Sequence, residues 1–204
     1  MNGSDLAADV QDDHETAFSR LGSSKAMYAV TGGEMDGDSV RAAAATDALA
    51  LADVLDSWGD GGDASATDLF ADLAADARER AADVADDPEI EEEPKLYGVL
   101  AEFETVPARL GGLLGRYLVA LEYAGQMVGF FVGDADPMAA DDFRGLRSDL
   151  EAERDRVIDA LDANCASDDD WEAAREAADA VVEAAYDDYV ETLESMGIKP
   201  KNVC

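Results

Sequence analysis

Carboxylates dominate the side chains that could do chemistry in this 204-residue chain, which has 48 Asp and Glu but one histidine. Carboxylate-bridged di-iron sites usually also need two Glu-x-x-His pairs, because iron takes both oxygen and imidazole ligands. The residue three positions before His14 is Gln11, and no Glu-x-x-His pair occurs. A complete di-iron site is therefore not expected, although a site made of carboxylates alone stays open. The candidate ligands of such a site are Glu15, Asp47, Glu122, Glu153 and Glu183.

Other catalytic groupings are poorly supported. There is no Gly-x-Ser-x-Gly motif, and His14 would have to fill every role that needs an imidazole. The glycines at 32–33 and 59–62 lack the strand context and the Lys-Ser/Thr pair of a phosphate-binding loop. Cys165 and Cys204 are isolated, which predicts free thiols and no structural zinc. The sequence leans away from an enzyme without deciding the question, and we expect no cofactor.

A group of polar residues lies inside the most apolar stretch, Leu110–Val132, which reads LGGLLGRYLVALEYAGQMVGFFV. Glu122 is flanked by apolar side chains, and a buried carboxylate must be paired, hydrogen-bonded or protonated. Gln126 follows one turn later and can donate to it, whereas Arg116 lies nearly two turns back on a neighbouring stripe. Two interpretations stay open. Arg116, Glu122 and Gln126 form either a satisfied polar cluster that fixes helix register or a ligand or metal contact.

The elements that position these residues are predicted to be helices. Leu110–Val132 is apolar nearly all round, which favours a buried central helix over the alternative, a membrane span, because its charged residues and unbiased flanks disfavour insertion. Helical periodicity also marks the other segments, and none shows convincing strand alternation. We predict an all-α single domain over 1–204, an antiparallel bundle of five to six helices with an acidic linker at 86–94. The predicted helices are 4–30, 38–58, 64–85, 96–132 (a short helix to 103, then the central one), 137–165 and 171–196.

The charge is extreme and spread along the chain, with 15 Lys and Arg against 48 acids and a formal net charge of −33. Abundant Ala, Asp and Gly with few Lys predict a cytoplasmic protein of an extreme halophile, where molar salt screens the self-repulsion. An acidic mimic of nucleic acid is the alternative. No window is basic enough to neutralise a run of phosphates, so direct nucleic-acid binding is not expected. The acidic Met1–Val10 segment does not read as a signal peptide, and no membrane association is expected.

The end of the chain, 198–204, is locally basic, unlike the rest. Lys199, Lys201 and Cys204 are therefore candidates for a contact with a partner protein. Packing of this tail back onto the bundle is the alternative, and it stays open.

Three segments carry a resemblance to a known family. Leu21–Lys25 (LGSSK), Gly125–Val132 (GQMVGFFV) and Glu194–Cys204 (ESMGIKPKNVC) resemble an uncharacterised helical family of salt-loving archaea. That family is similar to ferritin-like and rubrerythrin-type bundles, and some members are labelled transcription antitermination proteins. The resemblance implies a ferritin-like bundle in which Glu15 and Glu122 lie where the first and central helices offer ligands. The histidine partners of rubrerythrin iron are missing here.

These observations favour a non-enzymatic helical bundle that acts through contacts with an unidentified protein partner, with transcription regulation as the process that the resemblance implies. One alternative is a ferritin-like, rubrerythrin-related metal-binding oxidase centred on Glu122. Another is a client-binding assembly chaperone with an apolar groove near 110–132, which rests on fold-level analogy alone. Whether copies of the chain associate with one another also stays open.

Overall fold

The computed structural model describes residues 1–59, 64–86, 88, 90 and 93–200, with backbone alone at 64 and 65. Every regular element in these ranges is an α-helix, which confirms the all-α prediction. Nine helices are described, more than the five to six predicted. They are α1 (Gly3–Asp13), α2 (Glu15–Leu21), α3 (Ser24–Val30), α4 (Gly37–Gly59), α5 (Ala64–Val84), α6 (Lys95–Ala101), α7 (Val106–Gly133), α8 (Pro137–Asn164) and α9 (Asp168–Ser195).

The first predicted helix, 4–30, is divided into α1, α2 and α3. His14 leaves the helical conformation with φ −107° and ψ 25°, and Ser23 is extended with φ −109° and ψ 160°. Gly22 lies at the second break, where a Cβ atom would collide with a carboxylate oxygen of Glu122 on α7. The chain therefore turns twice and lies against α7 in short pieces.

Helix ends follow the capping side chains. Asp136 accepts hydrogen bonds from the backbone N–H groups of Met138 and Ala139, so α8 begins at Pro137 as predicted. The central helix α7 begins at Val106, four residues before the predicted start, with Thr105 as its cap and Pro107 in its first turn. A proline is tolerated there because the first turn has no intrahelical acceptor for its missing N–H.

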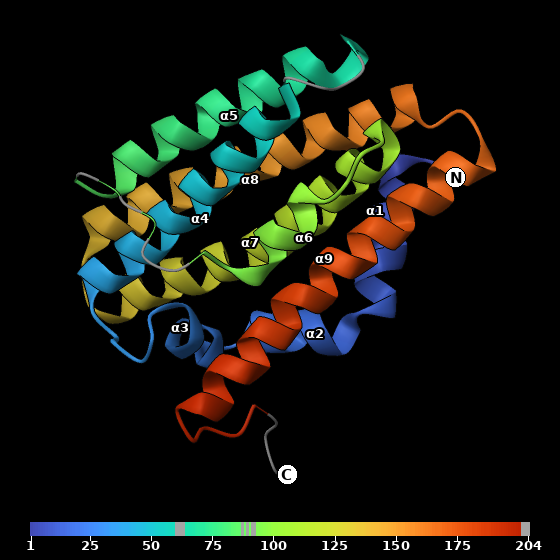
Figure 1. The fold of residues 1–204 in the computed structure, drawn as a ribbon. Coiled ribbons are helices and arrows are strands. Elements are labelled where there is room, and N and C mark those ends of the chain that lie inside the picture. The colour runs from blue at the N-terminus through green and yellow to red at the C-terminus, as the bar shows by residue number, and fades with distance from the viewer. Residues whose placement is uncertain (60–63, 87, 89, 91–92, 201–204) are drawn as a thin grey trace.

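Two helical hairpins, α4–α5 and α7–α8, lie side by side, and α9 lies against α7 and runs more steeply than either hairpin in the view of Figure 1. Helix α7 is central, in contact with α1, α2, α3, α6, α8 and α9, while α5 contacts α8 and α4 contacts α6. Residues 109–120 of α7 are all buried, whereas its second half is partly exposed. The predicted burial of this helix on all sides therefore holds for its first half. Within the described ranges, no helix has a run long and apolar enough to cross a membrane.

Glycines let α7 and α9 approach closely. A Cβ on Gly111 would overlap the backbone of Ala174, and one on Gly115 would lie 2.6 Å from the Ala178 carbonyl oxygen. This close approach is confined to the start of α7, because a Cβ at Gly125 would have no heavy-atom neighbour within 4 Å. Of the predicted linker, residues 87, 89, 91 and 92 lie outside the described part, and Ile90 packs against the core.

Candidate functional site

Two ion pairs, one buried and one partly buried, join the two hairpins. Asp47 on α4 pairs with Arg116 on α7, and Arg80 on α5 pairs with Glu153 on α8. The side chains are scarcely exposed at Arg116 (1%), Arg80 (6%) and Glu153 (5%). Removing charges from water is costly unless they are paired and hydrogen-bonded, so these contacts hold the hairpins in one relative position.

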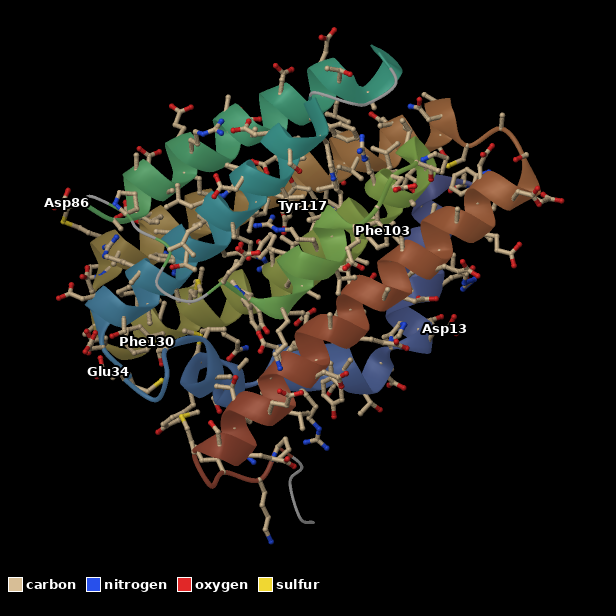
Figure 2. The ribbon with its side chains drawn as sticks, viewed as in Figure 1. Asp13, Glu34, Asp86, Phe103, Tyr117 and Phe130 are labelled. Atoms are coloured by element: carbon tan, nitrogen blue, oxygen red, sulfur yellow. The ribbon has the colours of Figure 1, made fainter. Side chains whose placement is uncertain are left out.

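Two tyrosines complete the pairs. The Tyr97 hydroxyl lies 2.8 Å from the Asp47 carbonyl oxygen, contacts the Asp47 carboxylate, and accepts a hydrogen bond from Arg116 Nε at 3.1 Å. The Tyr117 hydroxyl donates to Glu153 Oε2 at 2.8 Å, and the Arg116 guanidinium lies 4.8 Å from the centre of the Tyr117 ring. Figure 2 shows Tyr117 between the ribbons of α4 and α7. We refer to Asp47, Arg80, Tyr97, Arg116, Tyr117 and Glu153 as the charge cluster.

The charge cluster is electrically balanced. Burial raises the pKa of Tyr97 and the pKa of Tyr117 well above the ordinary value of a phenol, so both hydroxyls are neutral. Desolvation is the largest single influence and acts to lower the pKa of Arg116, but the charge of Asp47 and the contacts with Tyr97 and Tyr117 together raise it by more, so the guanidinium stays charged. Two guanidinium groups therefore face two carboxylates.

Two donors of the charge cluster have no acceptor. Nη2 of Arg80 and Nη1 of Arg116 are buried and have no hydrogen-bond partner in the described part of the chain. Buried polar atoms in proteins are usually hydrogen-bonded, so each exception asks for an explanation. Arg109 has a third such nitrogen, but its guanidinium stacks 5.2 Å from the centre of the Trp58 ring and does not belong to the charge cluster.

A cavity of about 550 Å³ adjoins the charge cluster, with Asp47 and Arg80 in its wall. Small side chains on facing helices leave this space: Ala42, Ala43 and Ala44 on α4 and Ala120 and Ala124 on α7. Residues of α3, α5, α6, α8 and α9 complete the lining, which also includes the exposed side chains of Glu34, Glu93 and Lys95. The volume falls within the usual range of small-molecule sites, about 300–1,000 Å³. We call it the α4–α9 cavity.

The lining of the α4–α9 cavity is mixed. Met127, Leu146 and Leu150 extend the apolar wall, while Tyr123 and Asp188 bring polar groups. Burial, together with the nearby charges of Asp188 and Asp47, raises the pKa of Tyr123, so its phenol is also neutral. Asp47 retains 28% exposure of its side chain although it is paired. The cavity thus combines an apolar wall with charged side chains from several helices, among them Asp38, Lys95 and Asp188.

The predicted polar group of α7 is divided between two places. Arg116 belongs to the charge cluster, whereas Glu122 and Gln126 line a second cavity of about 290 Å³ with Arg147 and Glu151. Gln126 Nε2 donates a hydrogen bond to the Gly22 carbonyl oxygen at 2.8 Å, and not to Glu122. Burial raises the pKa of Glu122, and the charge of Arg147 opposes this shift.

The metal candidates are not assembled into a site. Within the described ranges, no group of three or more His, Cys, Asp or Glu side chains could hold a metal ion, so Glu15 and Glu122 do not belong to one. The His14 side chain is only 16% exposed, and its Nε2 lies 3.0 Å from Asp179 on α9.

The part of the tail that the structure describes, 198–200, is hydrogen-bonded to the bundle. Lys25 Nζ donates to the Lys199 carbonyl at 2.8 Å, and the Tyr189 hydroxyl donates to the Pro200 carbonyl at 3.4 Å. Two of the predicted contact residues, Lys201 and Cys204, lie outside the described residues. The other cysteine, Cys165, is a buried free thiol whose pKa burial raises to about 11.

Part of the charge cluster was predicted from the sequence. Arg116 was named as a polar residue of the central helix, and Asp47 and Glu153 only as possible metal ligands. Arg80, Tyr97 and Tyr117 were missed. A signal for Arg80 was present, since Leu73, Ala77, Arg80 and Val84 recur at a spacing of three to four residues and Arg80 therefore lies on the apolar stripe of α5.

Comparison with protein-family models, with curated proteins and with solved structures gives no match for this chain. The resemblance to a family of salt-loving archaea therefore stays a prediction.

Proposed function

We propose that this protein is a non-enzymatic binding protein whose bundle holds a small molecule in the α4–α9 cavity. The observation that carries the proposal is the cavity itself, about 550 Å³ in volume and lined by both apolar and charged side chains. A concave site of this size, with an apolar wall and a few polar groups, is the usual form of a small-molecule site.

The position of the cavity supports a regulatory role. It is lined by α4 of one hairpin and by α7 and α8 of the other, and the charge cluster bridges the same hairpins. A ligand that binds one spacing of the hairpins better than another shifts the population toward that spacing. Occupancy could thereby alter the surface that a protein partner contacts, which links this proposal to the protein contacts predicted from the sequence.

The test is extraction of ligand from the purified protein. The wild type and an Ala124→Phe variant, whose larger ring fills the cavity from α7, are purified identically in molar KCl, denatured and analysed by mass spectrometry. We expect a compound in stoichiometric amount with the wild type and little with the variant. A matched Gly129→Ala variant, changed on the exposed side of α7, should retain the compound. If wild type and Ala124→Phe give equal amounts, or neither gives any, the proposal is wrong.

Exposed apolar side chains favour a second candidate, direct docking of a protein at one end of the bundle. Val132 and Met138, beside the α7–α8 turn, are 56% and 78% exposed, and Met35 before α4 is also exposed. These segments meet, because a Cβ on Gly37 would lie 3.3 Å from the Phe131 ring; Figure 2 labels Glu34 and Phe130 at this end. Clustered exposed apolar groups mark interaction sites. A Met35→Ser/Val132→Ser/Met138→Ser variant should lose any partner captured by the wild type from native cytoplasm. Unchanged capture would exclude this end as the contact.

The remaining expectations rest on the sequence alone. The ferritin-like arrangement, the halophilic cytoplasm, the transcription role and the alternatives of a metal-binding oxidase and an assembly chaperone are kept as proposals. Iron and manganese counted in protein purified without chelator would test the oxidase. Stoichiometric metal would favour it over the binding protein proposed above.

A further inference from the structure

Polar side chains from three helices meet in the wall of the α4–α9 cavity. Asp47 of α4, Tyr123 of α7 and Asp188 of α9 all line it. Besides burial, the charges of Asp188 and Asp47 raise the pKa of Tyr123, which places the phenol near both carboxylates. The fold therefore brings two carboxylates and a neutral phenol to one part of the cavity.

All three side chains can accept further hydrogen bonds. The Tyr123 hydroxyl has no hydrogen-bond partner in the part of the chain that the structure describes. The side chains of Asp47 and Asp188 are 28% and 31% exposed, although both lie in ion pairs. An ionised carboxylate has about four lone-pair positions, so one ion pair does not saturate it. A donor on a molecule in the cavity could thus reach several acceptors at once.

The basic residues of the lining already have partners. Arg80 pairs with Glu153, and Lys95 pairs with Glu191, and both of these carboxylates lie outside the lining. An anion in the cavity would therefore find no unpaired basic group there, and it would be repelled by the carboxylates of the wall.

The remaining charges of the lining have the same sign. Glu34, Asp38 and Glu93 are exposed, and within the described ranges they form no ion pair. Acids outnumber bases throughout this chain, so their number alone marks no site. Their charge nevertheless adds to that of Asp47 and Asp188 and favours a positively charged ligand.

A protonated amine matches these acceptors. Its ammonium group has three N–H donors and no acceptor, and hydrogen bonds between charged groups are stronger than those between neutral ones. The exposed side chains in the lining show that the cavity is open to solvent, so the ammonium group keeps part of its hydration. Ala124, Met127 and Leu150 offer an apolar wall for the rest of the molecule.

We propose that the α4–α9 cavity selects an organic cation, a protonated amine with an apolar body, whose ammonium group donates to Asp47, Tyr123 and Asp188. This inference rests on the proposed function and adds the chemical class of the ligand. The competing classes are a neutral molecule and an anion of the same shape.

Three probes with the same ring and the same two-carbon arm test the class: 2-(1-naphthyl)ethylamine, 2-(1-naphthyl)ethanol and 1-naphthylacetate. Binding of each to the full chain is measured by calorimetry and ligand-observed magnetic resonance at pH 7 in molar KCl. We expect the amine to bind at least about tenfold more tightly than the alcohol, since its donor is charged, and the acetate to bind most weakly.

Variants assign the preference to the cavity. Asp188→Asn removes one carboxylate charge at nearly constant shape and should weaken binding of the amine about fivefold, with little change for the alcohol. Asp187→Asn makes the same charge change at the neighbouring residue, which is exposed and outside the lining, and should leave both affinities unchanged. Tyr123→Phe removes only the phenol oxygen and should also weaken binding of the amine. Circular dichroism confirms that each variant is folded.

The outcomes separate this inference from the proposed function. Equal binding of amine and alcohol, tightest binding of the acetate, or equal losses in Asp188→Asn and Asp187→Asn overturns the cationic class and leaves a ligand-binding cavity. A compound extracted from the wild type gives a second readout, since a cationic compound supports the class and a neutral or anionic one overturns it. If no probe binds and no compound is extracted, this inference and the proposed function are both wrong.

Discussion

Arg80 is needed for the stability of the fold only while Glu153 is present. It interrupts the apolar stripe of α5, and its charge is compensated by Glu153 from α8. Breaking a buried pair by removing one partner leaves an uncompensated charge, whereas replacing both partners is often nearly neutral.

Arg80→Met should therefore lower the free energy of unfolding by about 3–5 kcal/mol, while Arg80→Met/Glu153→Gln should recover most of the loss. Urea unfolding at constant molar KCl measures both. Arg144→Met is the control, since Arg144 pairs with Asp141 on the surface and its loss should cost about 1 kcal/mol or less. A double variant as unstable as Arg80→Met would show that the pair does not act through its charge.

Glu122 gives a pH dependence of defined sign. Its folded pKa lies above the ordinary value of 4.5 because burial disfavours the charged form. The unfolded chain therefore releases this proton more readily, and the contribution of Glu122 to stability falls as pH rises from below 4.5 through the folded pKa.

Glu122→Gln removes this titration at nearly constant shape. We expect the variant to melt at a higher temperature than the wild type at pH 7 and at the same temperature at pH 4, in molar KCl. Glu172→Gln makes the same charge change at an exposed position of α9 and should show no such divergence. An equal difference between wild type and Glu122→Gln at both pH values would contradict the raised pKa.

At the scale of the residue, the sequence shows that a side chain is unusual for its apolar surroundings, but it does not show which residue is its ion-pair or hydrogen-bond partner. Arg116 stands out in an apolar helix, yet 48 acids are available as partners. Asp47 comes from 69 positions away, and that distance in the chain leaves no local pattern. Glu122 and Gln126 are one turn apart, but the tertiary position of Gly22 decides the hydrogen bond of Gln126.

At the scale of the element, two glycines that lower the helix propensity of α7 equally can differ in how they pack against other helices. Gly115 meets the α9 backbone at Ala178, whereas Gly129 faces open space. Both are expensive in an isolated helix because glycine loses more conformational freedom than alanine on folding.

Gly115→Ala should therefore destabilise the protein by about 1–3 kcal/mol, since α7 and α9 must move apart. Gly129→Ala should stabilise it by about 0.5–1 kcal/mol through helix propensity. Thermal and urea unfolding of the two variants, side by side with the wild type, measure the difference. If both substitutions stabilise, the close approach of α7 and α9 is wrong.

Helices were predictable where periodicity and caps agree. The pair Asp136 and Pro137 gave the start of α8 because capping is a local interaction. The capping box of α9 begins at Ser167, before the predicted start, since three successive aspartates obscured which residue is the cap. The division of 4–30 into three helices could not be predicted in full. Contacts with α7 and α9 position these short helices, and the helical periodicity of the sequence carries no information about such contacts.

At the scale of the whole molecule, repulsion among carboxylates opposes the burial of the apolar core. Ion pairs such as Arg156–Asp76 and Arg175–Asp13 neutralise some surface acids. With 15 basic residues for 48 acids, most of the negative charge stays uncompensated. Exposed pairs contribute little each, so the balance is set by screening from the solvent.

Stability should therefore rise steeply with KCl between about 0.2 and 2 M, as the Debye length falls from about 7 Å to about 2 Å. The measurement is the midpoint of urea unfolding at a series of KCl concentrations, repeated with NaCl at equal ionic strength. Screening acts through ionic strength, so the two salts should give the same curve. A flat response would contradict the prediction of a halophilic protein, and a rise confined to one salt would indicate a specific ion site in place of screening.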